Sequence, residues 1–221
     1  MGITQLIFDL DGTLVDSFPG IAFSAGAALA QILPGRTPPD FRPFIGPPIR
    51  EIFRQALPEN DLEIIGLLEQ SFRASYNSEG WRKTRTYPGV EKILTQACQS
   101  GRVCRVLTNK PKLPTHAILQ HLGLDRFVAE VITPDTRSPA YASKIDAALN
   151  LKQRHGLTAE ATLLVGDSED DRAAAAACGF QFAAVTFGYG RAFANNEHPV
   201  RFRLECFEDL SDILRLQTVY E

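Results

Sequence analysis

Short, uninterrupted runs of apolar residues recur along the chain, and polar or turn-forming residues bound each of them. Runs of this length without a polar face are typical of strands that are buried on both sides of a sheet. The pattern predicts strands at residues 3–8, 103–107, 128–133, 162–165 and 182–185.

Segments of helical length separate the later runs. They cover residues 113–122, 144–155 and 171–178, and the last is rich in alanine, the residue with the highest helix propensity. Buried strands that alternate with helices are typical of parallel sheets with helical crossovers. We therefore predict an α/β fold with a doubly wound parallel sheet.

The interval between the first two predicted strands, residues 16–101, is much longer than a single crossover requires. Within it, apolar residues recur at helical spacing in residues 49–57 and 62–72, and residues 20–33 are apolar and rich in alanine. The segments 34–48 and 77–88 contain prolines and indicate loops. We predict an inserted α-helical cap domain at residues 16–87, and an α/β core domain formed by residues 1–15 and 88–221.

Composition and charge narrow the class of protein. With 221 residues and a formal charge of −3 at pH 7, the chain can bury a large core and has no electrostatic reason to bind nucleic acid. We find no signal-peptide pattern and no apolar stretch of membrane-spanning length. The scattered cysteines form no CxxC pair, so we expect buried or partly buried reduced thiols at Cys98, Cys104, Cys178 and Cys206. These features predict a cytoplasmic protein, either a monomer or a homodimer, without a nucleic-acid or membrane partner.

Two acids follow the first predicted strand. Asp9 and Asp11 are separated by one residue, so along a strand they would point to the same side, and Gly12 would let the backbone turn beneath them. Paired acids at the end of a buried strand indicate a bound cation, because an uncompensated buried carboxylate is costly. Taken alone, the segment is equally consistent with an ordinary Asp-Gly turn.

Polar residues also follow two other predicted strands. Thr108, Asn109 and Lys110 come after the second, and an acidic segment that contains Asp167 comes after the fourth. In open α/β sheets, ligands bind beyond the carboxyl ends of the strands. We therefore expect these residues to converge with Asp9 and Asp11 at one edge of the sheet, where they could hold a hard metal ion and a phosphate.

These segments together resemble the motifs of the haloacid dehalogenase superfamily of phosphohydrolases, and the resemblance covers essentially the whole chain. It implies that Asp9 attacks phosphorus and that Asp11 acts as general acid and then as general base. It also implies that Thr108 binds the transferring phosphoryl group. Further phosphate contacts are implied around Gly12, Thr13 and Asn109.

The same resemblance implies a Mg²⁺ site. Its ligands would be the Asp9 carboxylate, the Asp11 backbone carbonyl, Asp167 and an outer acid, for which Asp171 matches the family pattern and Asp170 is the rival. Magnesium prefers oxygen ligands of this kind. The ion would also offset the repulsion between a carboxylate nucleophile and a phosphate anion.

The third motif of the family departs from its usual form here. Where many relatives carry Lys-Pro-x-Pro, this chain has Ala142-Ser143-Lys144-Ile145, and Lys144 is the nearest replacement. Lys110 and Arg137 are the alternatives for the catalytic cation. Lys144 could also be an exposed residue at the start of a helix.

Other residues favour one type of reaction among those that the family carries out. Asp11 favours a phosphate substrate over a halide, and Thr13 favours hydrolysis over the chemistry of sugar phosphomutases. The segments 16–17, 44–49, 87–90 and 188–190 look like those of phosphoglycolate phosphatases. We therefore predict a Mg²⁺-dependent phosphatase that acts on a small phosphorylated metabolite. A phosphomutase or a pyrophosphatase of the same family remains an alternative.

A non-catalytic regulatory protein on the same scaffold is a second alternative, although none of the essential acids is missing. A response-regulator receiver also clusters acids, Thr and Lys on a parallel sheet, but the long helical insertion argues against it. In the cap, Arg50 is our candidate for contact with an anionic substrate, and it could equally be a solvated helix residue. The cap would close over the site and exclude water.

Overall fold

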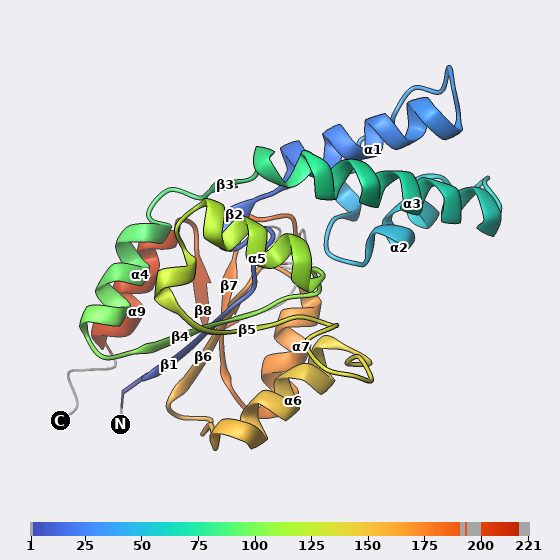
Figure 1. The fold of residues 1–221 in the computed structure, drawn as a ribbon. Coiled ribbons are helices and arrows are strands. Elements are labelled where there is room, and N and C mark those ends of the chain that lie inside the picture. Colours follow the sequence, from blue (N-terminus) through green and yellow to red (C-terminus); the bar gives the residue numbers. More distant parts are fainter. Residues whose placement is uncertain (1, 191–192, 194–199, 217–221) are drawn as a thin grey trace.

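The computed structural model describes residues 2–190, 193 and 200–216. A twisted sheet lies between two layers of helices, and a separate group of helices projects from one end of it (Figure 1). This arrangement confirms the predicted α/β fold with a doubly wound parallel sheet.

The main sheet has six strands in the order β5-β4-β1-β6-β7-β8, and every neighbouring pair is parallel. The central strand β1 is buried on both faces and pairs with β4 and β6. The strands are β1 (Gln5–Phe8), β4 (Val103–Leu107), β5 (Val128–Ile132), β6 (Thr162–Gly166), β7 (Gln181–Val185) and β8 (Phe202–Leu204).

Side chains alternate between two hydrophobic layers, because successive residues of a strand face opposite sides of the sheet. Leu6 and Phe8 pack in one layer with α4 (Val90–Gln99), α5 (Lys112–His121) and α9 (Leu210–Leu216). Ile7 packs in the other layer with α6 (Lys144–His155) and α7 (Glu169–Cys178). The sheet is therefore covered on both faces, as its uninterrupted apolar strands require.

The inserted segment forms three helices with a hydrophobic cluster of their own. They are α1 (Phe18–Ile32), α2 (Ile49–Ala56) and α3 (Leu62–Ser78). At the centre of this cluster, the fully buried Phe53 meets the rings of Phe41 and Phe72 edge-on. A two-stranded antiparallel ribbon of β2 (Val15–Asp16) and β3 (Arg85–Thr86) leads into and out of the insertion (Figure 1). The limits of the core and cap domains stay a prediction, and residues 1, 191–192, 194–199 and 217–221 of the proposed core lie outside the described part.

Several short elements were not predicted from the sequence. They are the edge strand β8, the ribbon strands β2 and β3, and the 3-10 turns Arg42–Phe44, Gly80–Lys83, Asp125–Phe127 and Phe207–Asp209. Each is too short to show a period of its own. The prediction for two cysteines was wrong: Cys98 and Cys206 are exposed, whereas Cys104 and Cys178 are buried, and all four thiols are free. Among the described residues, no helix combines the length and apolarity that crossing a bilayer requires.

The cap depends on a close backbone approach between α1 and the turn Gly80–Lys83. A Cβ atom on Gly20 would lie 2.2 Å from the carbonyl oxygen of Gly80, whereas one on Gly26 of the same helix would meet nothing within 4 Å. We expect Gly20→Ala to lower the free energy of unfolding by about 1–3 kcal/mol through overpacking. Gly26→Ala should instead raise it by roughly 0.5–1 kcal/mol through helix propensity. Urea unfolding of the two variants checks this, and equal effects would contradict it.

Candidate active site

The loop after β1 brings Asp9 and Asp11 to the carboxyl edge of the sheet. Asp9 is buried and Asp11 is partly buried. Between them and Val15 the chain makes a tight turn in which the Gly12 amide donates to the Val15 carbonyl at 2.9 Å. Gly12 has a φ of 85°, and a Cβ atom there would lie 2.2 Å from Asp167 Oδ2. Only glycine allows this close approach of the turn to Asp167.

Three buried carboxylates gather at this edge. Asp9, Asp167 and Asp171 each offer an oxygen, and these oxygens lie within 4.8 Å of one another. Asp167 follows β6, and Asp171 lies in the first turn of α7. Asp171 also completes a capping box, because its Oδ2 accepts hydrogen bonds from the amide and hydroxyl of Ser168 at 3.0 and 2.5 Å. The capping box therefore aligns Asp171 with the other two acids.

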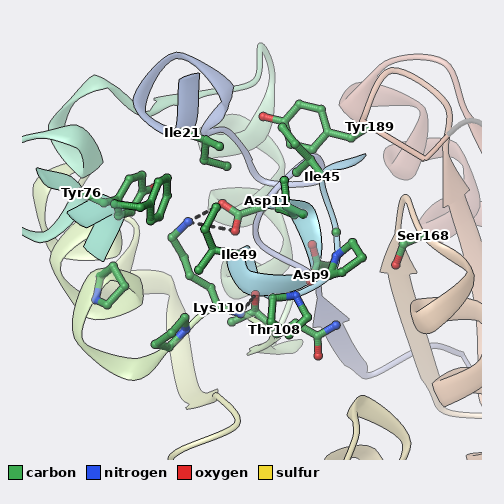
Figure 2. Close-up of a pocket in the computed structure, with 18 of the residues that line it drawn as sticks. Asp9, Asp11, Ile21, Ile45, Ile49, Tyr76, Thr108, Lys110, Ser168 and Tyr189 are labelled. Carbon is green, nitrogen blue, oxygen red and sulfur yellow. Dashed lines mark hydrogen bonds and ion pairs between the residues drawn. The ribbon is translucent and has the colours of Figure 1, made fainter. Parts of the chain in front are cut away.

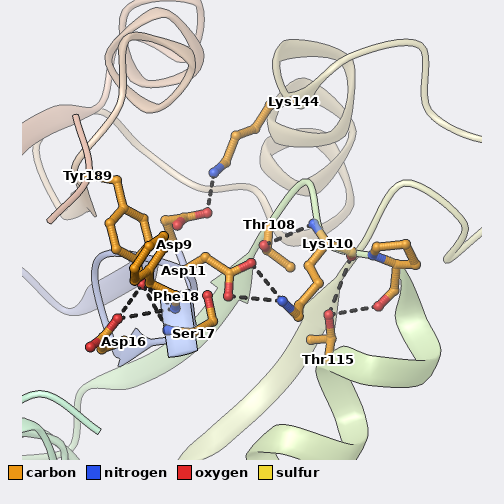
Figure 3. A network of polar contacts seen from close by, with 11 residues as sticks. Asp9, Asp11, Asp16, Ser17, Phe18, Thr108, Lys110, Thr115, Lys144 and Tyr189 are labelled. Carbon is orange, nitrogen blue, oxygen red and sulfur yellow. Dashed lines mark hydrogen bonds and ion pairs between the residues drawn. The ribbon is translucent and has the colours of Figure 1, made fainter. Parts of the chain in front are cut away.

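Lys144 is the cation inside this cluster. It is the first residue of α6, and Ser143 caps that helix by accepting a hydrogen bond from the Asp146 amide. The Lys144 Nζ atom lies 2.5 Å from Asp9 Oδ1 (Figure 3) and 2.5 Å from Asp171 Oδ1. Burial alone would lower the pKa of Lys144, but the carboxylates of Asp171 and Asp9 outweigh it and raise that pKa.

The negative charge of the cluster is only partly compensated. Burial raises the pKa of Asp9 well above its usual range, although Lys144 acts in the opposite direction. Burial, followed by the charge of Asp171, raises the pKa of Asp167 to about 7. Carboxylates that are this difficult to ionise favour a bound cation, because a cation restores the charge balance. The donor set, the burial and the spacing of these oxygens therefore fit a divalent metal ion.

The segment after β4 approaches the other side of Asp11. Thr108 Oγ1 accepts a hydrogen bond from the Lys110 amide at 3.1 Å, which shapes the turn. The Lys110 side chain lies 3.0 Å from both carboxylate oxygens of Asp11. Its Nζ atom also lies 4.8 Å from the centre of the Tyr76 ring, which belongs to α3 of the cap. The structure thus places both Lys110 and Lys144 in the site, although the sequence suggested only one of them as the catalytic cation.

Arg137 and Asp170 lie away from the carboxylate cluster. Arg137 is exposed and pairs with Asp146 at 2.8 Å. Asp170 is also exposed and accepts a hydrogen bond from Asn109 Nδ2 at 3.0 Å. The structure therefore brings Lys144 and Asp171, and not Arg137 or Asp170, to the cluster.

Tyr189 connects the cluster to the start of the cap. Its amide donates to Asp167 Oδ2 at 2.6 Å, while its hydroxyl donates to Asp16 Oδ1 at 2.7 Å. The same hydroxyl accepts from the amides of Ser17 and Phe18 at 2.8 and 2.9 Å, where α1 begins (Figure 3). Sequence reasoning gave Tyr189 no role, and its contacts span more than 170 positions. The available signal was its place between two glycines.

A pocket with a volume of about 120 Å³ opens between the core and the cap above these groups. Asp9, Asp11, Thr108 and Lys110 lie on its core side, and the cap supplies Ile21, Ile45, Ile49 and Tyr76 (Figure 2). Asn109, Lys144 and Asp167 also line it. Three predicted contacts, Gly12, Thr13 and Arg50, are not among the lining residues.

Burial keeps Thr13 out of the pocket, and solvent exposure keeps Arg50 out of it. Thr13 is fully buried in the turn after β1. The Arg50 side chain is 53% exposed and lies 3.6 Å from Glu69, so it is a solvated residue of α2. Arg73 of α3 lines the pocket instead.

Comparisons with known proteins agree with this site. The family model for haloacid dehalogenase-like hydrolases matches residues 6–185. The chain is 33% identical to a phosphoglycolate phosphatase from Vibrio cholerae over 206 residues, which cover 88% of this chain and 90% of that protein. It is also 33% identical to the tyrosine-protein kinase PtkA from Mycobacterium tuberculosis over 191 residues, which cover 85% of this chain and 63% of that protein.

Solved structures share the fold. A predicted phosphatase from Clostridium acetobutylicum superposes with a TM-score of 0.84 at 23% identity, over 97% of this chain and all of the other. The match to the family model covers the strands that carry Asp9, Thr108 and Asp167, and the relatives cover most of the chain. The chain therefore belongs to the haloacid dehalogenase-like hydrolases, as an enzyme of their phosphatase branch.

Proposed function

We propose that this enzyme hydrolyses a small phosphomonoester with the help of Mg²⁺, and that Asp9 carries the phosphoryl group between two steps. The observation that supports this most strongly is the placement of Asp9. Its carboxylate lies in the buried cluster with Asp167, Asp171 and Lys144 and lines the pocket together with Asp11. A nucleophile, an acid/base group and a cation are thereby available at one place.

In the first step, an Asp9 oxygen attacks phosphorus and the bond from phosphorus to the leaving oxygen breaks. Asp11 donates a proton to that oxygen, so the alcohol leaves uncharged. In the second step, Asp11 takes a proton from water as the water oxygen attacks phosphorus. The bond between phosphorus and Asp9 then breaks, which releases inorganic phosphate, restores the Asp9 carboxylate and leaves Asp11 protonated for the next cycle.

Other residues position the reacting groups. Lys144 holds the Asp9 carboxylate at 2.5 Å, and Lys110 holds that of Asp11 at 3.0 Å. We assign the contacts to the phosphoryl oxygens to Thr108, Asn109 and the backbone near Gly12. Phosphoryl transfer depends mainly on such positioning and on compensation of charge.

We assign the metal to the acids of the cluster, namely Asp9, Asp167 and Asp171, together with the Asp11 backbone carbonyl. When bound, Mg²⁺ supplies positive charge that offsets the repulsion between the Asp9 carboxylate and the phosphate. Mg²⁺ is the ion we expect, because all of these ligands are hard oxygen atoms.

Phosphoglycolate is one candidate substrate, because the relative from Vibrio cholerae is named a phosphoglycolate phosphatase. Mutase and pyrophosphatase activities are the alternatives. A panel of phosphomonoesters, a sugar bisphosphate and pyrophosphate, assayed with Mg²⁺, separates them. The cytoplasmic location and the monomeric or dimeric state stay predictions.

Asp9→Asn tests the nucleophile. Because an amide cannot form the phosphoryl intermediate, we expect kcat/KM to fall by about 10³-fold or more. The matched control is Asp170→Asn at the exposed aspartate outside the cluster, for which we expect less than about a twofold change. Phosphate release is the measurement, with circular dichroism as a check on folding. An Asp9→Asn protein with normal turnover would rule out this mechanism.

Lys144→Met tests the assignment of the cation. The variant leaves Asp9 and Asp171 without their shared partner, so we expect kcat/KM to fall by about 10²–10³-fold. Arg137→Gln, which breaks only an exposed ion pair, should change kcat/KM by less than about twofold. If Arg137→Gln were the more damaging substitution, the third-motif cation would have been assigned to the wrong residue.

Metal binding should stabilise the protein more at high pH than at low pH. Since the pKa of Asp167 is raised from 3.8 to about 7, the metal-free fold binds more protons than the unfolded chain between these values. Its free energy of unfolding therefore falls as the pH rises through that window. Mg²⁺ requires ionised carboxylates, so it acts most strongly above the window.

We expect about 5 mM Mg²⁺ to raise Tm by roughly 3–8 °C at about pH 8 and by much less at about pH 5.5. Differential scanning calorimetry measures both shifts. Asp167→Asn should abolish the shift, and Asp170→Asn should retain it. A Mg²⁺ shift that is equal at the two pH values, or larger at the lower one, would contradict the metal assignment.

A further inference from the structure

The cap side of the pocket is a wall of apolar side chains. It is formed by Ile21, Ile45, Ile49, Ile52 and Phe72, together with Pro47 and Pro48. The neutral polar side chains on the same side are those of Tyr76 and Asn77. The core side, with Asp9, Asp11 and Thr108, takes the phosphoryl group, so the wall faces the part of the substrate that leaves.

Each cation that lines the pocket already has a carboxylate partner in the structure. Arg73 pairs with Glu69 at 2.8 Å, Lys110 pairs with Asp11 at 3.0 Å, and Lys144 pairs with Asp9 at 2.5 Å. A leaving group with its own carboxylate, such as glycolate, would have to break one of these pairs or lie unpaired against isoleucines. Breaking the pair of Lys110 or Lys144 would leave a buried charge without a partner, as would a carboxylate against the isoleucines, so these arrangements are unfavourable. The Arg73–Glu69 pair is more exposed and costs less to break.

The extent of the wall points in the same direction. It comprises seven apolar residues, whereas the glycolate part of phosphoglycolate has a single methylene group to place against them. A more apolar group would displace water from the wall, and burial of each methylene favours binding by about 3-fold or more. The wall can therefore contribute substantially to binding an apolar, uncharged leaving group.

We propose that the leaving group is an uncharged, mainly apolar alcohol, of aryl or long alkyl type, and not a second anion. The proposal rests on the phosphomonoesterase function and specifies its class of substrate. Ile49 is a suitable residue to test it, because it lines the pocket and is only partly buried in the cap.

The first experiment compares kcat/KM for ethyl, butyl, hexyl and 2-phenylethyl phosphate and for 2-phosphoglycolate, with Mg²⁺. The four neutral alcohols have similar acidities, so differences among their esters report burial of the leaving group. We expect kcat/KM to rise about 3-fold per methylene until the wall is covered, and 2-phenylethyl phosphate to exceed ethyl phosphate by about 30-fold. A flat series, or a preference for 2-phosphoglycolate, would overturn the proposal and leave the phosphatase function intact.

A pair of variants locates the effect. We expect Ile49→Ala to lower the ratio of kcat/KM for 2-phenylethyl phosphate over ethyl phosphate by roughly 5-fold, through loss of apolar contact. The control is Leu67→Ala on α3, because Leu67 is 42% exposed and is not among the pocket residues. The Leu67→Ala substitution should leave this ratio of kcat/KM values unchanged. If the ratio were the same in the two variants, Ile49 would not contribute to the selectivity, which would contradict the proposed wall.

Binding of phosphonates provides a readout that does not depend on turnover. We expect calorimetry to show that 2-phenylethylphosphonate binds at least about 10-fold more tightly than 3-phosphonopropionate, a carboxylate analogue. If this preference holds while no ester is hydrolysed, the proposed function fails and the apolar site stands. Equal or reversed affinities, or no binding of either compound, would refute the apolar site.

Discussion

The position of the Lys144 ammonium between Asp9 and Asp171 is the interaction on which the rest of the site depends. Three carboxylates are buried at one edge of the sheet, and their mutual repulsion would be prohibitive without compensation. Lys144 contacts two of them, the Ser168 hydroxyl and amide support Asp171, and the amides of Tyr189 and Gly190 support Asp167. The compensation is incomplete, as the raised pKa values of Asp9 and Asp167 show, and a divalent cation would complete it.

Two side chains connect this cluster to the cap. Tyr189 supports Asp167 through its amide and binds the start of α1 through its hydroxyl. Lys110 contacts Asp11 in the core and lies over the Tyr76 ring in the cap. The groups that position the carboxylates therefore also contact the elements that enclose the pocket. A displacement of the cap would disturb the contacts of Tyr189 and Lys110, so enclosure of a substrate and alignment of the acids are physically coupled.

Much of the fold was predictable from the sequence, because β1, β4, β6 and β7 are buried on at least part of both faces and their apolar runs are continuous. The helix α6 covers the predicted residues 144–155, and Gly156 ends it in the left-handed conformation that glycine adopts readily. The strands β2, β3 and β8 have only two or three residues each, and their stability comes from pairing. Local patterns cannot reveal such elements, since their partners lie far away in the sequence.

The α/β class, the helical insertion, and the acids and threonine that follow three strands could be predicted from local periodicity and from the common direction of parallel strands. Contacts between distant segments were needed to show that Lys144 and Lys110 both enter the site, that Asp171 rather than Asp170 joins the acids, and that Arg50 remains in solvent. It also revealed the role of Tyr189. The reason is physical: long side chains reach over several ångströms, and their partners are chosen by packing between distant segments, which no local pattern records.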